Sequence, residues 1–266
     1  NDLVLGTFGR GFYVLDDYSS LRQMKEENIS KDAMLLPVRD ALSFENSYPL
    51  GLPKNAFQGD SYYRGENLGS EALFAYYIKD KVVSAKDQRV KEEEKIAKSG
   101  KDNSYPSFEQ MDKERNEEKA KVYLTVRDSN GQIVRKLTLP ADQVGLQRVS
   151  WNLRSAPKDP VSSGGDGFYN PFAGVSEGPR VSPGTYTATL SRWQNEKMTS
   201  LGEPVSFKVK SLDHQVLPAT DQDAMVAFKR KAEEVQRVEQ SLSGAVSAAS
   251  GELSLIRKAI NAMDQP

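Results

Sequence analysis

The side chains of this chain that could do chemistry are carboxylates, serines and a single histidine. Asp16 and Asp17 are adjacent, and a pair of carboxylates is the catalytic apparatus of most glycoside hydrolases. Adjacent residues of a strand point to opposite faces, which separates two carboxylates that would have to share a substrate. The sequence therefore predicts that this pair serves in a turn or as a helix cap.

The other candidate catalytic features are equally weak. His214 is the one histidine, so a serine–histidine triad would have to use it, yet it lies in Ser211–Gln215, directly after the last predicted strand, as a linker residue would. The glycine-rich segment Ser162–Gly167 lacks the Gly-Lys-Ser/Thr ending of a phosphate loop and is predicted to be a flexible loop.

Metal sites are also disfavoured by residue type. The chain has no cysteine and one histidine, which excludes disulfides, thiolate sites and histidine-pair sites. No loop has the regular Asp/Asn spacing of a calcium site. We therefore assign no catalytic, cofactor-binding or metal-binding residue, and predict no cofactor.

Two groups of aromatic residues suggest carbohydrate binding as an alternative. The first lies in an irregular Gly-, Pro-, Asn- and Tyr-rich segment, where such rings more simply anchor a long loop to the fold. The second accompanies the loop carboxylates Asp166 and Glu177. The groups are Tyr48, Phe57, Tyr62 and Tyr63, and Phe168, Tyr169 and Phe172.

Any such site would have to be positioned by short strands. The stretch Val122–Arg154, read with Val181–Leu190, alternates β-branched and aromatic residues with turn residues. Asn130–Gly131 is a strong hairpin signal because both residues tolerate positive φ. This succession predicts a β-sandwich of immunoglobulin/fibronectin-III type. The strands are expected at Ala72–Ile78, Val122–Arg127, Ile133–Leu139, Arg148–Arg154, Thr185–Leu190 and Val205–Lys210.

A charged insertion, Lys81–Lys121, separates two of these strands. Opposite charges recur at helical i,i+4 spacing in Lys91–Lys95 and Glu114–Lys119, which predicts helices. Ser107 is the expected N-terminal cap of the second helix. The insertion is either a partner-binding arm or a solvated helical pair, and we favour the second interpretation.

The C-terminal part predicts one long helix, capped at Thr220–Asp221. Its apolar residues alternate at spacings of three and four, with Glu239 as the one polar break, and this heptad-like pattern needs a partner. A hairpin broken near Ser243–Gly251 is the alternative. The residues of this pattern are Met225, Phe228, Ala232, Val235, Leu242, Val246, Ala249, Leu253, Ile256, Ile260 and Met263.

The N-terminal segment predicts a hairpin, Leu3–Phe8 with Phe12–Leu15, that cannot bury its own faces. We expect its sheet to be completed by strands upstream of residue 1. The run Asn1–Asp17, with Leu21–Gln23 after it, resembles the end of the last blade in large secreted bacterial proteins with sortilin-like or Asp-box (BNR) β-propellers, a family often labelled glycosyl hydrolases. The similarity continues in order through Phe74–Asp80, Tyr105–Glu109, Asp128–Gly131, Arg148–Arg154 and Pro183–Tyr186. No Asp-box motif occurs in this chain.

Composition and this resemblance together set the functional expectation. Lys and Arg number 36 against 37 Asp and Glu, which argues against a nucleic-acid partner. No run approaches the ~20 apolar residues of a membrane span. The predicted domains are residues 1–44 (the end of a blade and a connector), 45–69 (a linker), 70–212 (the sandwich, with a helical insertion at 84–119) and 213–266 (a helical tail).

We predict a non-catalytic accessory module that docks to the β-propeller of its own chain and mediates assembly, with a homo-oligomer formed through the helix seam. One alternative is a fragment of a glycoside hydrolase whose catalytic site lies in the propeller. The other is a carbohydrate-binding module whose partner is a glycan. The resemblance implies a secreted or periplasmic location.

Overall fold

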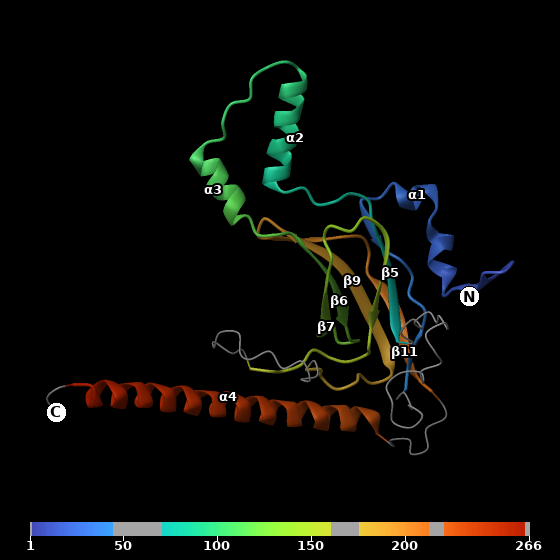
Figure 1. The fold of residues 1–266 in the computed structure, drawn as a ribbon. Helices are drawn as coiled ribbons and strands as arrows, with labels where there is room; N and C mark the ends of the chain where they lie inside the picture. Colours follow the sequence, from blue (N-terminus) through green and yellow to red (C-terminus); the bar gives the residue numbers. More distant parts are fainter. Residues whose placement is uncertain (1, 45–70, 161–175, 213–220, 264–266) are drawn as a thin grey trace. The chain divides into compact units, whose positions relative to one another are not determined.

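The computed structural model of this chain describes residues 2–44, 71–160, 176–212 and 221–263 (Figure 1). It combines several sheets with a helical insertion and a long C-terminal helix, as predicted. The residues divide into two compact units, one of Asn1–Leu153 with Pro183–Asp213, the other of Arg154–Ser182 with His214–Pro266.

The larger sheet of the first unit has the strand order β4-β11-β9-β6-β7, with β10 paired to β9. All its pairs are antiparallel except β4 with β11. These strands are β4 (Ala41–Ser43), β6 (Lys121–Arg127), β7 (Ile133–Leu139), β9 (Gly184–Gln194), β10 (Lys197–Ser200) and β11 (Val205–Ser211). Every predicted strand of this sheet is present, while β4 and β10 were not predicted.

A second sheet places β5 between β3 and β8, in antiparallel pairs. The strands are β3 (Ala33–Leu35), β5 (Ala72–Ile78) and β8 (Gly145–Trp151). Five of the seven β5 residues are buried, and the other two are half-buried. Residues on both faces of this strand are therefore shielded from solvent.

The two sheets contact each other through aromatic side chains. Phe74 of β5 meets Phe207 of β11 edge to face, with ring centroids 5.3 Å apart. Trp151 of β8 lies 6.0 Å from Tyr186 of β9 and 6.4 Å from Phe207. Edge-to-face pairs of this kind add to the free energy gained by burying the rings. The core of the first unit therefore lies between these sheets, near β5, β9 and β11 (Figure 1).

Two tight hairpins differ in how well the sequence predicts them. The β6–β7 hairpin is confirmed, but its connection is Asp128–Gln132, and of Asn130–Gly131 it is Gly131 that takes a positive φ, 76°. The Asp128 carboxylate accepts bonds from the backbone N–H groups of Asn130 and Gln132, both at 2.9 Å. The β9–β10 turn instead puts Asn195 and Glu196 at φ 51° and 59°.

The charged insertion forms two helices, α2 (Ala85–Lys98) and α3 (Phe108–Asn116). The Ser84 hydroxyl caps α2 by accepting a bond from the Asp87 N–H. Ser107 and Gln110 form a reciprocal capping box at α3, which confirms Ser107 as the predicted cap. Neither helix buries a residue, so both contribute little to the core.

The C-terminal helix α4 (Gln222–Asn261) belongs to the second unit and is a single helix. The alternative of a break near Ser243–Gly251 is therefore wrong. Asp221 caps the helix by accepting a bond from the Ala224 N–H at 2.8 Å. Among the described residues, none of the helices is both long enough and apolar enough to cross a bilayer.

Candidate functional site

The acidic pair Asp16–Asp17 has a structural role. Asp17 has φ 45° and caps the 3₁₀ helix η1 (Tyr18–Gln23) by accepting a bond from the Ser19 N–H at 3.4 Å. Its carboxylate also accepts the Ser19 hydroxyl at 2.5 Å. A carboxylate engaged in capping is not free to act on a substrate, so the predicted turn or cap role is confirmed for Asp17.

Most of the other sequence-predicted candidates lie outside the described residues. This applies to His214, the Ser162–Gly167 loop, Asp166 and both groups of aromatic residues. Glu177 is described, and its Oε2 lies 3.2 Å from Nε of Arg154 in an ion pair. Within residues 2–44, 71–160, 176–212 and 221–263, no three His, Asp or Glu side chains gather closely enough to hold a metal ion.

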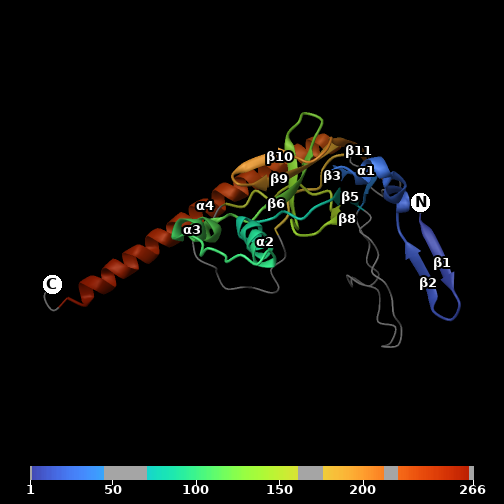
Figure 2. The same cartoon turned by 90° about the horizontal axis from the view of Figure 1, so that it is seen from above.

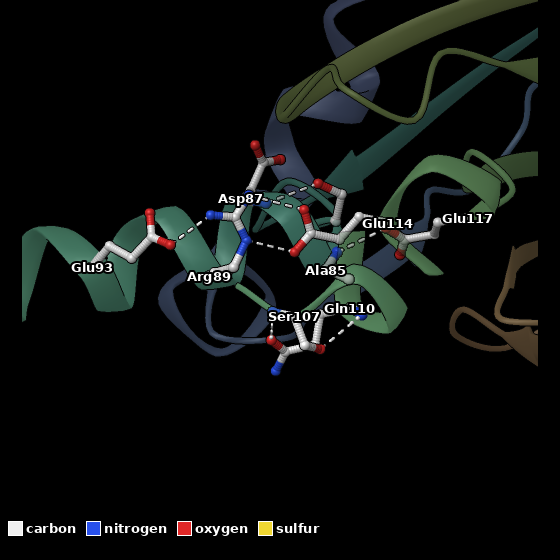
Figure 3. A network of polar contacts seen from close by, with 9 residues as sticks. Ala85, Asp87, Arg89, Glu93, Ser107, Gln110, Glu114 and Glu117 are labelled. Atoms are coloured by element: carbon white, nitrogen blue, oxygen red, sulfur yellow. Dashed lines mark hydrogen bonds and ion pairs between the residues drawn. The ribbon is translucent and has the colours of Figure 1, made fainter. Parts of the chain in front are cut away.

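A polar network joins α2 to α3 (Figure 3). Arg89 reaches across with Nε 2.6 Å from Oε1 of Glu114 and Nη2 3.0 Å from Oε2, and its Nη1 bonds Glu93 at 2.5 Å. These bonds raise the pKa of Arg89 and lower the pKa of Glu114. Glu117 accepts a bond from the Ala85 N–H at 2.8 Å and so connects the two helices a second time.

An open hollow of about 380 Å³ lies beside this network. Because Arg89 is already matched by two carboxylates, the hollow offers an anion no unpaired guanidinium. The neighbouring rings of Tyr105 and Phe108 are 84% and 76% exposed. The pairing of charges within the insertion supports its interpretation as a solvated helical pair. The hollow is lined by Arg89, Glu93, Asn103, Ser104, Tyr105, Pro106 and Met111.

Two surfaces of the molecule expose many apolar side chains, and the first is the N-terminal hairpin. It consists of β1 (Leu3–Thr7) and β2 (Gly11–Leu15), which form a two-stranded sheet and pair with no other strand among the described residues (Figure 2). All ten residues are exposed, Phe12 at 82% and Val4 at 60%.

Both faces of this hairpin are apolar. Leu3 pairs with Leu15 and Leu5 with Tyr13 on one face, while Val4 pairs with Val14 and Gly6 with Phe12 on the other. A solvated sheet normally keeps one face polar, so this hairpin has the composition of a strand pair that is covered on both sides.

Arg148 holds the end of the hairpin against the second sheet. From β8 its Nη1 donates to the carbonyl oxygen of Asp16 at 2.8 Å, and its Nη2 donates to that of Asp17 at 3.0 Å. The Asp17 N–H in turn donates to Oδ1 of Asp2 at 2.9 Å. The guanidinium fork therefore fixes the exit of the hairpin at two successive carbonyl groups.

Helix α4 carries the second such surface. The helix has no buried residue, and the large apolar side chains at the positions predicted from the sequence are 42% to 71% exposed, with Met225 the least exposed and Phe228 and Val235 the most. These residues form the predicted heptad-like stripe, which the structure leaves without a covering element among the described residues of its own unit.

Comparisons of this chain with protein-family models, with curated proteins and with solved structures find no match. The two residues that sequence reasoning missed, Arg89 and Arg148, both act over long separations in the chain, and no local motif could have revealed them.

Proposed function

We propose that this chain is a non-catalytic accessory and interaction module of a secreted, propeller-containing protein. The hairpin β1–β2 docks into the closing blade of a β-propeller, the two facing sheets support it, and α4 mediates assembly. The single observation that carries this proposal is that the hairpin is apolar on both faces and exposed on both.

The chemistry of the hairpin favours a β-propeller as its partner. Its outer strand edges offer unpaired N–H and C=O groups, which another strand can satisfy by pairing. Its two faces each need an apolar layer, and the stacked blades of a propeller supply one on either side. Fully burying a side chain such as Leu5 or Val14 stabilises the docked state by about 1.5–3 kcal/mol.

The facing sheets suit a supporting role. We infer an immunoglobulin/fibronectin-III-like sandwich, supported by the mostly antiparallel pairing and the aromatic core around Trp151, Phe74 and Phe207. Arg148 couples this core to the hairpin through the carbonyl groups of Asp16 and Asp17. A rigid body with an anchored hairpin lowers the entropic cost of docking.

Amide hydrogen exchange tests the docking step. The proposal requires that the reading frame upstream of Asn1 encodes a β-propeller, so the chain is measured alone and as part of the protein that includes the upstream region. We expect the amides of Leu3–Leu15 to exchange freely in the chain alone and to be strongly protected in the longer protein. Equal exchange in both would overturn the proposal.

A matched pair of variants separates docking from general destabilisation. Leu5→Asp places a charge on the hairpin, while Ile133→Asp places one at a similarly exposed residue of β7, since the two side chains are 53% and 57% exposed. We expect Leu5→Asp alone to abolish the protection of the hairpin. Hydrolysis of a glycoside by the chain itself would instead favour an enzyme.

A further inference from the structure

The stripe on α4 has a regular heptad register, and we call its members the α4 seam. Written as a heptad, the seam alternates two sets of positions from Met225 to Met263 without an insertion or deletion. One set is Met225, Ala232, Glu239, Val246, Leu253 and Ile260, and the other is Phe228, Val235, Leu242, Ala249, Ile256 and Met263.

The opposite side of α4 is the side that its own unit covers. Val226, Arg230 and Glu233 are half-buried, and the Glu234 carboxylate lies 3.3 Å from Nζ of Lys158. These residues lie on the far side of the helix from Phe228 and Val235, because successive residues are 100° apart. Residues 154–160 can therefore hold the first turns of α4 while leaving the α4 seam accessible.

We propose that the α4 seam pairs with the α4 seam of a second copy of this chain, in an antiparallel orientation centred near Gly244. In this register Leu242 faces Val246 of the second copy, and Phe228 faces Ile260 of the second copy. This inference rests on the proposed role of α4 in assembly, and it adds the identity and direction of the partner.

Glu239 selects the antiparallel orientation. A parallel pair in register would bury Glu239 against Glu239 of the second copy, and two like charges in one layer repel each other. The antiparallel register places Glu239 opposite Ala249 of the second copy. The small methyl group leaves room for the carboxylate to reach water at the edge of the layer.

Side-chain volume selects the same orientation. The antiparallel register pairs Ala232 with Ile256 and Glu239 with Ala249, so a small residue faces a larger one in each case. A parallel pair would stack alanine on alanine at 232 and at 249 and leave voids there, while Phe228 would meet Phe228. A one-heptad shift of the antiparallel register would face Ala232 with Ala249.

The α4 seam is also long enough to form an interface with a second copy. With its flanking residues, the α4 seam approaches the roughly 20–30 residues per partner of a standard protein interface. Gly244 and Gly251 lie off the seam, where an added Cβ would meet nothing within 4 Å. Their small size therefore creates no void between the paired helices.

Cysteine cross-linking tests the orientation, because the chain has no cysteine of its own. Phe228→Cys and Ile260→Cys are prepared separately, one isotopically labelled, then mixed and oxidised. We expect a disulfide between the two different variants, at twice the 29.5 kDa mass of one chain. We expect neither variant to cross-link with itself, because both positions lie far from the centre of the antiparallel register. Self-cross-linking of Phe228→Cys would show parallel pairing and overturn the proposal, and Ser247→Cys, on the outer side, is the control.

Sedimentation equilibrium tests the second copy itself. Leu242 and Leu255 are similarly exposed, at 65% and 66%, but Leu242 belongs to the α4 seam and Leu255 does not. We expect Leu242→Asp to raise the dimer dissociation constant on the order of 100-fold and Leu255→Asp to leave it nearly unchanged. Circular dichroism checks that each variant stays helical.

A monomeric unsubstituted chain at about 100 µM, where micromolar interfaces are populated, would overturn this inference. The helix seam would then have another occupant, such as a helix beyond Pro266 or a different protein. That result would leave the docking of the hairpin untouched, since hydrogen exchange of Leu3–Leu15 tests the hairpin separately.

Discussion

Strand β5 and the hairpin β1–β2 are built from the same kinds of residue and differ in what covers them. In β5, Phe74 and Tyr76 are 0% and 2% exposed, whereas Phe12 and Tyr13 of the hairpin are 82% and 55% exposed. The apolar pattern specifies that both strands require burial. It does not specify what covers them: Phe74 of β5 packs against Phe207 of β11, whereas none of the described residues covers the hairpin.

Removing one aromatic ring from each region should have the largest and most different effects on stability. Trp151→Ala should lower the free energy of unfolding by about 3–5 kcal/mol, because the ring is 1% exposed and contacts Tyr186 and Phe207. Phe12→Ala should cost less than about 0.5 kcal/mol. Urea denaturation measures both, and a similar cost for the two variants would show that the hairpin is already covered.

The link between the two regions should show the next largest effect. Arg148→Ala removes two charge-assisted bonds and should cost about 1.5–3 kcal/mol, with faster amide exchange in η1. Arg148→Lys should recover only part of this loss, since an ammonium lacks the planar fork. Arg10→Ala, in the exposed hairpin turn, is the matched control. Unchanged exchange in Arg148→Ala would mean that the fork does not anchor the hairpin.

Helix α3, unlike the hairpin, is stabilised by contacts within its own first turn, so a smaller and more local effect is expected there. Ser107→Ala removes one half of the capping box and should destabilise α3 by about 1 kcal/mol. Exchange of the α3 amides should accelerate while that of β5 stays the same. Ser107→Asp should restore the slower exchange, and Ser104→Ala in the preceding loop should have no effect.

The smallest expected effect is the pH response of the insertion. The pKa of Glu114 is lowered by its bonds to Arg89, so the unfolded chain binds more protons in the acid range. This contribution to stability is complete above the ordinary glutamate pKa, about 4.3, and is lost as the pH falls through the lowered value. In Arg89→Gln the pKa of Glu114 should rise towards its ordinary value, and NMR titration of the Glu114 carboxyl measures this change. A carboxyl that titrates alike in both proteins would contradict the pairing.

Local chemistry made much of this fold predictable from the sequence. The Ser107 cap follows from its spacing to Gln110, the β6–β7 hairpin from Asn130–Gly131, and α4 from its heptad pattern. Each signal depends on residues a few positions apart, whose geometry is fixed by backbone periodicity.

The rest depends on contacts between distant residues or on backbone strain. Arg148 bonds carbonyl groups 131 and 132 positions away, and Arg89 pairs with Glu114 25 positions away. The β9–β10 turn places Glu196 at φ 59°, a conformation that favours glycine, asparagine or aspartate. The parallel pairing of β4 with β11 joins segments that are far apart in the sequence, and no local pattern encodes it.

The length of α4 has a consequence for avidity. Its 40 residues rise about 1.5 Å each, so the helix spans about 60 Å. In the antiparallel pairing proposed here, the two points where each chain enters its helix are separated by roughly that length. The assembly is then bivalent, and two targets spaced to match would be held at a raised effective concentration without any additional contact.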